Sequence, residues 1–507
     1  MLPPLDLSLY LIIPLFVFLF IRTLKKKSLK SLPGPKGLPI IGNLHQLDNL
    51  ILYKQLSQLS KKHGPIFSLK LGLRRAIVVS SSKLAKETLK NHDIVFSGRP
   101  KLLGQQKLSY NGLDIALSQY GDHWREVRKI GVTHVLSARR VSSFSSIRNF
   151  EIQKMIEKIS THASSSSSSK VVNLSDMLVS LNSTIICRSA FGRRYDDNEG
   201  VERSRFHGLF NELQAVVAAN FVSDYIPFLG WIDRLNGMHK RLERIFKEMD
   251  SFYQEVIDEH MDPNRKTLKD KGEEDMIDVL LKLKKEGSFS IDITYDHIKA
   301  LVMDMLVAAT DTTSATTVWA MFALMKNPRV LKKVQEEIRN QEIKKDYLEE
   351  DDIQKFTYFK AFIKEVLRLH LPAPLLVPRE TTQHCIIDGY EIPAKTIVYI
   401  NAWAIHRDPE IWKDPEEFYP ERFLENQYDI DFRGQDFELI PFGSGRRICP
   451  GLHMAVTTLD LVLANLLYSF NWELPLGVRK EDIDTQVLPG LVLHKKNPLC
   501  LVAKSHI

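Results

Sequence analysis

One cysteine, Cys449, lies in a stretch whose composition suits a thiolate that binds a metal. The stretch PFGSGRRICPG, residues 441–451, surrounds this cysteine with two arginines and three glycines. Positive charge and backbone N–H groups stabilise a thiolate. Apolar residues at helical spacing follow Gly451, so we expect Cys449 at a helix N-terminus, where the helix dipole favours negative charge. A surface turn with a free thiol fits the same residues, and this stretch alone favours neither interpretation.

A second candidate site lies in a long apolar helix predicted over residues 292–323. The run MLVAATDTTSATT, residues 305–317, places Asp311 and Thr312 among apolar neighbours. An acid beside a hydroxyl can relay protons, and threonine hydroxyls that bond to the preceding turn can bend a helix. An opening of the helix here would leave room for water and a small ligand. The alternative is a helix whose polar residues simply face solvent, and this run alone favours that alternative.

Arginines recur at positions where they could hold carboxylates, because a guanidinium binds a carboxylate through two parallel hydrogen bonds. Trp124 and Arg128 are four residues apart on a predicted helix, Arg379 follows an apolar strand, and Arg447 is two residues before the cysteine. Taken one at a time, each of these arginines would more often form a surface ion pair.

Three charged residues could form a buried network that stabilises the fold. Glu365 and Arg368 are three residues apart and therefore lie on one face of a predicted helix. Arg422 lies in an aromatic-rich irregular stretch, DPEEFYPERF, residues 414–423. A buried network of the three would hold the core together, whereas an exposed pair would contribute little.

The elements that position these residues are mostly helical. Of the 507 residues, 44% are hydrophobic, which is enough for a large core. Residues 64–81 indicate a β-hairpin, residues 374–400 contain short strands with a turn at Asp388-Gly389, and residues 470–505 give further strands. The sequence predicts a mainly α protein with a smaller β part assembled from both ends. Helical periodicity covers residues 120–138, 145–162, 174–190, 203–218, 236–260, 275–286, 292–323, 327–342 and 357–371.

The N-terminus indicates a membrane anchor. LSLYLIIPLFVFLFI, residues 7–21, carries no charge and with its flanks is just long enough to span a bilayer. Basic residues typical of the cytoplasmic side follow, and no small-residue cleavage site favours the alternative of a cleaved signal peptide. We expect an anchor over residues 1–24, a basic and proline-rich spacer over residues 25–45, and one folded domain over residues 46–507.

The net charge of +7 comes mostly from this region, because residues 22–36 contain six Lys or Arg and no acid. The basic balance therefore belongs to the flank of the anchor and does not indicate a nucleic-acid partner. Four cysteines in a chain of this length argue against a disulfide framework and fit a reducing compartment.

Together these stretches resemble the cytochrome P-450 superfamily of haem-thiolate monooxygenases, over essentially the whole chain and in the same order. The cysteine motif of the family, F-x-x-G-x-R-x-C-x-G, is matched from Phe442 to Gly451. One position departs from the family pattern: Ala309 stands where glycine is usual, and its methyl group would crowd the groove above the haem. The other family motifs are matched by Trp124 and Arg128, by AATDTT at residues 308–313, and by Glu365 and Arg368 together with Arg422.

The resemblance implies a role for each motif residue. Cys449 would be the axial ligand of haem b, and Asp311 and Thr312 would deliver protons to bound dioxygen. The residues implied to hold the haem are Trp124, Arg128, Arg379, Phe442 and Arg447, and those implied to lock the core are Glu365, Arg368 and Arg422. The residues implied to line the substrate pocket are Phe221, Val302, Ala308, Ala309, Ala373, Val377, Leu488 and Val492.

In the amino-acid sequence of its motifs and their flanks, the chain is most similar to plant microsomal members of the family. These belong to a clan active in specialised metabolism, and the chain looks close to a branch of it that oxidises aldoximes. The resemblance implies a single-pass anchor in the endoplasmic reticulum membrane and a haem-thiolate catalytic domain that faces the cytosol. It also implies dioxygen, an NADPH–cytochrome reductase and a lipophilic substrate: an aldoxime, indole, phenylpropanoid or terpenoid. A haem-thiolate isomerase or dehydratase and a non-catalytic haem sensor are the alternatives, and the Asp311-Thr312 pair favours the monooxygenase.

Overall fold

The computed structural model describes residues 31–48, 50–164, 171–194, 201–265, 274–287, 289–340, 345–425 and 429–506. The predicted anchor, residues 1–24, and residues 25–30 of the predicted spacer lie outside the described residues. The described part of the spacer is attached to the body by backbone hydrogen bonds: Ser68 N–H donates to Pro33 at 2.8 Å, and Asn43 N–H donates to Lys70 at 2.6 Å.

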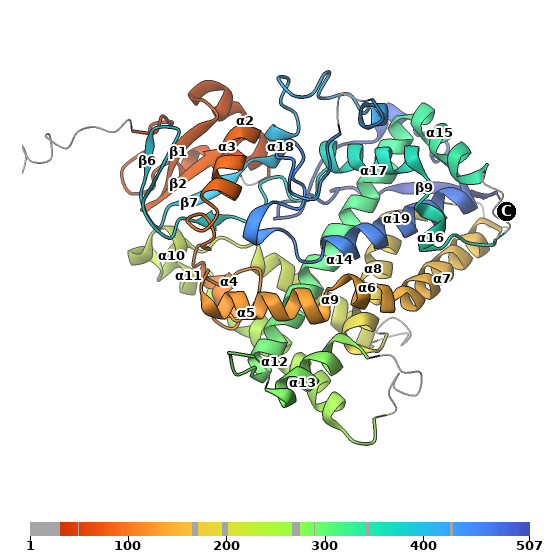
Figure 1. Ribbon diagram of the computed structural model, residues 1–507, viewed down its shortest axis with the longest axis horizontal. Helices are drawn as coiled ribbons and strands as arrows, with labels where there is room; N and C mark the ends of the chain where they lie inside the picture. Colours follow the sequence, from red (N-terminus) through yellow and green to blue (C-terminus); the bar gives the residue numbers. More distant parts are fainter. Residues whose placement is uncertain are drawn as a thin grey trace, which may run out of the picture.

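The described chain is mainly helical with small sheets, as predicted (Figure 1). The longest helices are α14 (Tyr295–Lys326), α12 (Met238–Met261) and α7 (Ser145–Ser164). The others are α2 (Leu52–His63), α3 (Ser82–Lys86), α4 (Leu103–Leu108), α5 (Asp122–Ile130), α6 (Ala138–Ser143), α8 (Leu174–Phe191), α9 (Val201–Val217), α10 (Val222–Tyr225), α11 (Ile232–Leu235), α13 (Met276–Glu286), α15 (Pro328–Arg339), α16 (Glu350–Ile353), α17 (Thr357–Leu369), α18 (Ala402–Ile405) and α19 (Leu452–Ser469).

Helix α14 passes through the middle of the helical body and packs against α8, α17 and α19 (Figure 1). Its residues from Thr313 to Met325 are buried. Helix α19 is apolar and long enough to cross a membrane, but 67% of it is buried in the protein, so here it is a core helix.

The threonine hydrogen bonds considered for this run are present within α14, and the helix does not open there. The Thr312 hydroxyl donates to the Ala308 carbonyl at 2.7 Å, and the Thr316 hydroxyl donates to the Thr312 carbonyl at 2.7 Å. The helix nevertheless continues without a break from Tyr295 to Lys326. A hydroxyl can share a carbonyl with the backbone N–H without displacing it, and the alanines in this turn are strong helix formers.

The strands join distant parts of the chain, as predicted for the β part. The largest sheet has the order β1-β2-β7-β4, with β1 (Ile66–Leu71) antiparallel to β2 (Arg74–Val79), β7 (Ile397–Ile400) parallel to β2, and β4 (Arg379–Glu380) antiparallel to β7. A second sheet pairs β3 (Val171–Asn173), β9 (Cys500–Ser505) and β8 (Phe470–Glu473).

The hairpin of β5 (Cys385–Ile387) and β6 (Tyr390–Ile392) turns at Asp388-Gly389, as predicted. Both turn residues have positive φ, 50° and 79°, which suits a two-residue hairpin turn.

The helix predicted over residues 120–138 is shorter in the structure. Helix α5 ends at Ile130, a π-helical turn follows over Gly131–Val135, and α6 begins at Ala138. A Cβ atom on Gly131 would lie 2.4 Å from Cδ1 of Ile115, so the glycine allows the loop before α5 to pack against the end of the helix.

Candidate active site

Cys449 lies in the turn that leads into α19, as the sequence predicts. Its N–H donates to the Phe442 carbonyl at 2.9 Å, which closes the loop around the cysteine. Gly445, in the same loop, has a φ of 69°, and a Cβ atom there would lie 2.1 Å from the Leu89 carbonyl. The cysteine loop therefore lies so close to the backbone at Leu89 that only glycine fits at position 445.

The thiol of Cys449 needs a cation in order to ionise. Burial raises its pKa, while the Gly451 N–H and the Arg128 charge lower the pKa by smaller amounts. A metal ion deprotonates a thiol that coordinates it. The site therefore fits a metal ligand better than a free reactive thiolate.

The side chains of Arg447 and Trp124 contact each other, and both donate hydrogen bonds to one loop, residues 114–118. The Trp124 indole N–H donates to the Ile115 carbonyl at 2.9 Å. The Arg447 guanidinium donates to the carbonyls of Ser97, Ile115 and Ser118 at 2.9, 3.0 and 2.5 Å and lies 4.2 Å from the Trp124 ring centroid.

Arg128 and Arg379 reach the loop of the cysteine itself. Arg128 Nη2 donates to the Ile448 carbonyl at 2.6 Å, directly before Cys449. Arg379 Nη2 donates to the Ser444 carbonyl at 2.9 Å, and its Nη1 lies 3.8 Å from Asp93. The structure thus brings four of the five residues implied to hold the haem to the cysteine loop and the loop 114–118, while the fifth, Phe442, lies in the cysteine loop itself. These four are Trp124, Arg128, Arg379 and Arg447.

Sequence analysis missed a further arginine of this cluster, Arg99. Its Nε donates to the Ala116 carbonyl at 2.8 Å, and its Nη1 donates to the carbonyls of Val377 and Pro378 at 2.7 and 2.8 Å. Arg99 is 5% exposed. No spacing rule singles it out, because it stands alone in the loop FSGRP and acts through carbonyls that are distant in sequence.

These arginines carry more positive charge than the surrounding residues neutralise. Burial, together with the charge of the neighbouring Arg379, lowers the pKa of Arg447 to about 9. Burial likewise lowers the pKa of Arg379 to about 10 and that of Arg99 well below its ordinary value, and neighbouring arginines add to both effects. A buried group of like charges is stabilised by an anion, so the cluster fits the two propionates of a haem.

The loop 114–118 is also fixed to α14. Asp304 Oδ2 accepts hydrogen bonds from the N–H groups of Ile115 and Ala116 at 2.7 and 3.2 Å. Burial raises the pKa of Asp304 well above its ordinary value, and the charge of Asp114 raises it further. The same loop therefore joins the arginine cluster to the helix that carries the acid and hydroxyl.

One turn of α14, residues 308–312, is accessible to solvent, although the part of the helix that follows it is buried. Ala308 is exposed, and Ala309, Asp311 and Thr312 are partly exposed. The Asp311 carboxylate lies 2.7 Å from Nε2 of His494, in the C-terminal segment. The acid and the hydroxyl predicted to act together are thus accessible on the same turn.

The predicted Glu–Arg–Arg network is buried and fully paired. Arg368 Nε donates to Glu365 Oε2 at 2.7 Å, and Arg422 Nε donates to Glu365 Oε1 at 3.2 Å. Arg368 and Glu365 are both 0% exposed. The network touches α17 and the irregular stretch after Trp412, so it holds these elements together.

The residues predicted to line the substrate pocket differ in their exposure. Val377 and Leu488 are exposed, and Ala373 and Val492 are partly exposed. Phe221 is 1% exposed and Val302 is 0% exposed. These two side chains are covered by protein in the described structure, and their contact with a substrate stays a prediction.

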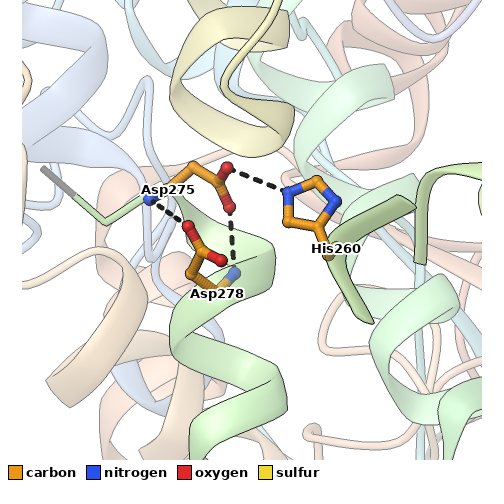
Figure 2. Close-up of side chains that lie close together, drawn as sticks. All are labelled: His260, Asp275 and Asp278. Carbon is orange, nitrogen blue, oxygen red and sulfur yellow. Dashed lines mark hydrogen bonds and ion pairs between the residues drawn. The ribbon is translucent and has the colours of Figure 1, made fainter. Parts of the chain in front are cut away.

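A different cluster, on α12 and α13, offers three metal-ligand types. Figure 2 shows His260, Asp275 and Asp278 facing one another, with His260 Nε2 2.9 Å from Asp275 Oδ2. The guanidinium of Arg265 already neutralises both carboxylates, at 3.0 Å from Asp275 and 3.3 Å from Asp278. The two aspartates also form the capping box of α13, so the cluster is explained as a helix cap.

Known proteins with similar sequences match this chain over almost its whole length. The 5-OH-xanthotoxin synthase of Pastinaca sativa is 47% identical over 96% of this chain and 96% of its own length. The strychnine-11-hydroxylase of Strychnos nux-vomica is 44% identical over 98% of this chain and 97% of its own. A zebrafish cytochrome P-450 solved with abiraterone superposes with a TM-score of 0.71, at 25% identity, over 90% of this chain and all of that chain.

The family match agrees with the site. The model of the Cytochrome P-450 family matches residues 32–502, and the described part of that range includes the cysteine loop, the arginine cluster and the accessible turn of α14. The plant relatives place the chain among the enzymes of plant specialised metabolism. The chain belongs to the cytochrome P-450 family and is a haem-dependent monooxygenase.

Proposed function

We propose that the protein hydroxylates a planar, lipophilic aromatic compound of the coumarin type. The accessible turn of α14, which carries Asp311 and Thr312 in an otherwise apolar helix, is the observation on which the reaction class depends. The substrate class is supported by relatives: two are named 5-OH-xanthotoxin synthases and one a 6,7,8-trihydroxycoumarin synthase, at 45–47% identity. An aldoxime is the competing candidate, because the sequence also resembles an aldoxime-oxidising branch.

Cys449 would hold the haem iron through its sulfur, and the surplus positive charge of the arginine cluster would hold the propionates. When bound, the haem supplies the redox chemistry that activates dioxygen and transfers one oxygen atom. Arg128 stabilises the thiolate through its charge and through the Ile448 carbonyl that it fixes. Phe442 would shield the sulfur from water, and the hydrogen bond from the Cys449 N–H to the Phe442 carbonyl keeps the two residues close together.

The acid–hydroxyl pair on α14 would control protons at the ligand site. The Thr312 hydroxyl donates its proton to the Ala308 carbonyl at 2.7 Å, which leaves the hydroxyl oxygen free to accept a hydrogen bond. Asp311, the preceding residue, would pass a proton to this oxygen as the hydroxyl turns away from Ala308 and releases its own proton toward the ligand. Such positioned acid–base groups typically contribute about 10²–10⁴-fold to a rate.

The exposed positions Ala308, Val377 and Leu488 would contact the substrate first. They are apolar, so they would favour a lipophilic ligand and offer it no charged partner. The methyl group of Ala309 would narrow the space above the haem and favour a flat molecule.

Several exposed apolar side chains would bring the body to the endoplasmic reticulum membrane. Those half exposed or more include Leu38, Ile40, Leu73, Phe228, Trp231 and Leu235. Hydrogen bonds join their segments: Gly72 N–H donates to the Ile41 carbonyl at 3.2 Å, and Leu73 N–H donates to Tyr225 at 2.9 Å. Together with the predicted anchor, this surface would place the substrate entrance against lipid while an NADPH-dependent reductase supplies electrons from the cytosolic side.

The test begins with the reduced, carbon monoxide-treated protein, whose long-wavelength Soret band reports thiolate ligation. We expect Cys449→Ala to lose this band and Cys385→Ala, a buried cysteine on β5, to keep it. Turnover with NADPH, reductase and a panel of xanthotoxin, other coumarins, an indole aldoxime and strychnine then tests the substrate. Product from the aldoxime without reductase would instead favour the dehydratase, and binding without turnover would favour the sensor.

A further inference from the structure

Asp311 has a contact outside its own helix that the proposed mechanism does not use. His494 Nε2 lies 2.7 Å from Asp311 Oδ1, and the two side chains are 27% and 21% exposed. Histidine is the side chain that most readily exchanges a proton near neutral pH. A histidine that contacts both solvent and an acid can carry protons between them.

Three hydrogen bonds fix the backbone beside His494, so the contact does not depend on a loose segment. The Leu493 N–H donates to the Pro372 carbonyl at 2.8 Å, and the Trp319 indole N–H donates to the Leu493 carbonyl at 2.6 Å. The Leu488 N–H donates to the His494 carbonyl at 2.9 Å. Because Trp319 and Asp311 both belong to α14, the helix holds the C-terminal segment at two points.

The charged groups around His494 do not compete for Asp311. Lys495, the next residue, donates to the Asp484 carbonyl at 2.5 Å, and its Nζ lies 5.5 Å from the Trp319 ring centroid. Its charge also interacts with Lys326 and with the Asp484 carboxylate. Among the described residues, Asp311 is thus the carboxylate in contact with the His494 ring.

We propose that His494 positions Asp311 and reloads it with protons from solvent. The protonated ring gives its Nε2 proton to Asp311 Oδ1, so that imidazolium and carboxylate become imidazole and carboxylic acid. No electrons move in this step, and because Nε2 itself is buried in the contact, the partly exposed ring regains its Nε2 proton from water by rotating this nitrogen toward solvent. Asp311 then passes the proton toward the Thr312 hydroxyl, so this inference rests on the role proposed for the acid–hydroxyl pair.

The geometry allows Asp311 to leave this contact. Although the two atoms are 2.7 Å apart, Nε2 makes no directed hydrogen bond to any described residue. The Asp311 side chain can therefore rotate between an orientation aligned with Nε2, in which it takes the proton, and one turned toward Thr312, without breaking an aligned bond in the observed geometry. A carboxylate that must alternate between a proton source and a hydroxyl needs this freedom.

The contact itself is tested by infrared spectroscopy of the full-length, haem-loaded protein in a phospholipid bilayer, which needs no substrate. The carboxyl band that disappears in Asp311→Asn belongs to Asp311. We expect this band to shift in His494→Gln and to stay in place in His384→Gln. His384 is a matched control because it also lies 2.8 Å from a carboxylate, that of Glu391, on the distant β5–β6 hairpin. An unshifted Asp311 band in His494→Gln would overturn the proposal.

The proton function is tested by the hydrogen peroxide released per NADPH oxidised, with reductase and xanthotoxin as the probe. We expect His494→Gln to raise this ratio several-fold without changing the spectral dissociation constant of xanthotoxin, and His494→Lys, a protonated donor, to restore part of the coupling. His384→Gln should match the wild type. If Asp311→Asn also leaves the ratio unchanged, the role proposed for Asp311 fails; if Asp311→Asn raises the ratio and His494→Gln does not, only the role of His494 fails.

Discussion

Arg368 and Glu365 form a two-pronged ion pair in the interior, with Nε donating to Oε2 at 2.7 Å and Nη2 donating to Oε1 at 2.9 Å. The other Arg368 donor, Nη1, is also satisfied, by the carbonyls of His406 and Pro415 at 2.8 and 2.7 Å. A buried pair of this kind contributes little relative to an apolar pair, but removal of one partner leaves a buried charge without compensation. The network therefore fixes a particular arrangement of α17 and the chain that follows it.

Glu365→Gln removes the carboxylate shared by Arg368 and Arg422, and we expect it to lower the free energy of unfolding by about 3–5 kcal/mol. Urea unfolding of the haem-loaded protein measures this loss. Glu157→Gln is the matched control, since Glu157 pairs with Lys154 at 3.0 Å on the surface of α7 and should cost less than about 1 kcal/mol. Equal effects of the two variants would contradict an internal role for Glu365.

Arg128→Gln should weaken haem retention. The Arg128 charge lowers the pKa of the Cys449 thiol, and its guanidinium fixes the Ile448 carbonyl, so the variant destabilises the thiolate and the loop together. A charge-assisted hydrogen bond is worth about 1.5–3 kcal/mol, which corresponds to roughly ten-fold or more in the rate of haem transfer to apomyoglobin. Lys129→Gln, on the exposed side of the same helix, should transfer haem at the wild-type rate.

The sequence predicted the elements whose pattern is periodic. The helix predicted over residues 236–260 is observed as α12 over Met238–Met261, and the one predicted over residues 174–190 is α8 over Leu174–Phe191. The break after Ile130 was missed. At this point Gly131 packs so closely against Ile115 that a Cβ atom would clash, and no local pattern reports such a contact.

The sequence identified those residues of the candidate site that belong to recognisable motifs, and it missed those that do not. Arg99 and His494 were missed for one physical reason: each acts on a group that is far away in the sequence, the carbonyls of residues 377 and 378 for Arg99 and the Asp311 carboxylate for His494. Single arginines and histidines give no sequence signal of such contacts. Only the folded backbone brings them together.

Asp460, on α19, makes the stability of the protein sensitive to pH. Burial raises its pKa to about 7, the charge of Lys360 opposes this, and Oδ1 has no hydrogen-bond partner among the described residues. A carboxyl with a raised pKa in the folded state contributes stability while it is protonated, and this contribution is lost as pH rises from about 4 through about 7. Between pH 5 and pH 8 the loss should be of the order of 2–3 kcal/mol.

Asp460→Asn should remove this dependence. Thermal unfolding at pH 5, 6, 7 and 8 should show a smaller decline for the variant than for the wild type. Asp482→Asn, at an exposed aspartate of a 3₁₀ turn whose pKa is lowered by Arg479, is the control and should leave the decline across this range unchanged. Parallel declines for Asp460→Asn and the wild type would show that Asp460 does not hold its proton in this range.

Ala309→Gly tests whether the methyl group of Ala309 limits the size of the substrate. The variant removes one methyl group from the accessible turn of α14, and a glycine in a helix costs about 0.5–1 kcal/mol in stability. Ala320→Gly carries the same helix cost at a buried position on α14 three turns away, so it separates stability from pocket shape. We expect Ala309→Gly to improve the spectral dissociation constant of a prenylated furanocoumarin relative to xanthotoxin by about four-fold, as one CH₂ of room is worth about 0.8 kcal/mol. If both variants leave the ratio of the two dissociation constants at the wild-type value, the Ala309 methyl group does not face the ligand, and the flat substrate proposed above must be selected by other residues.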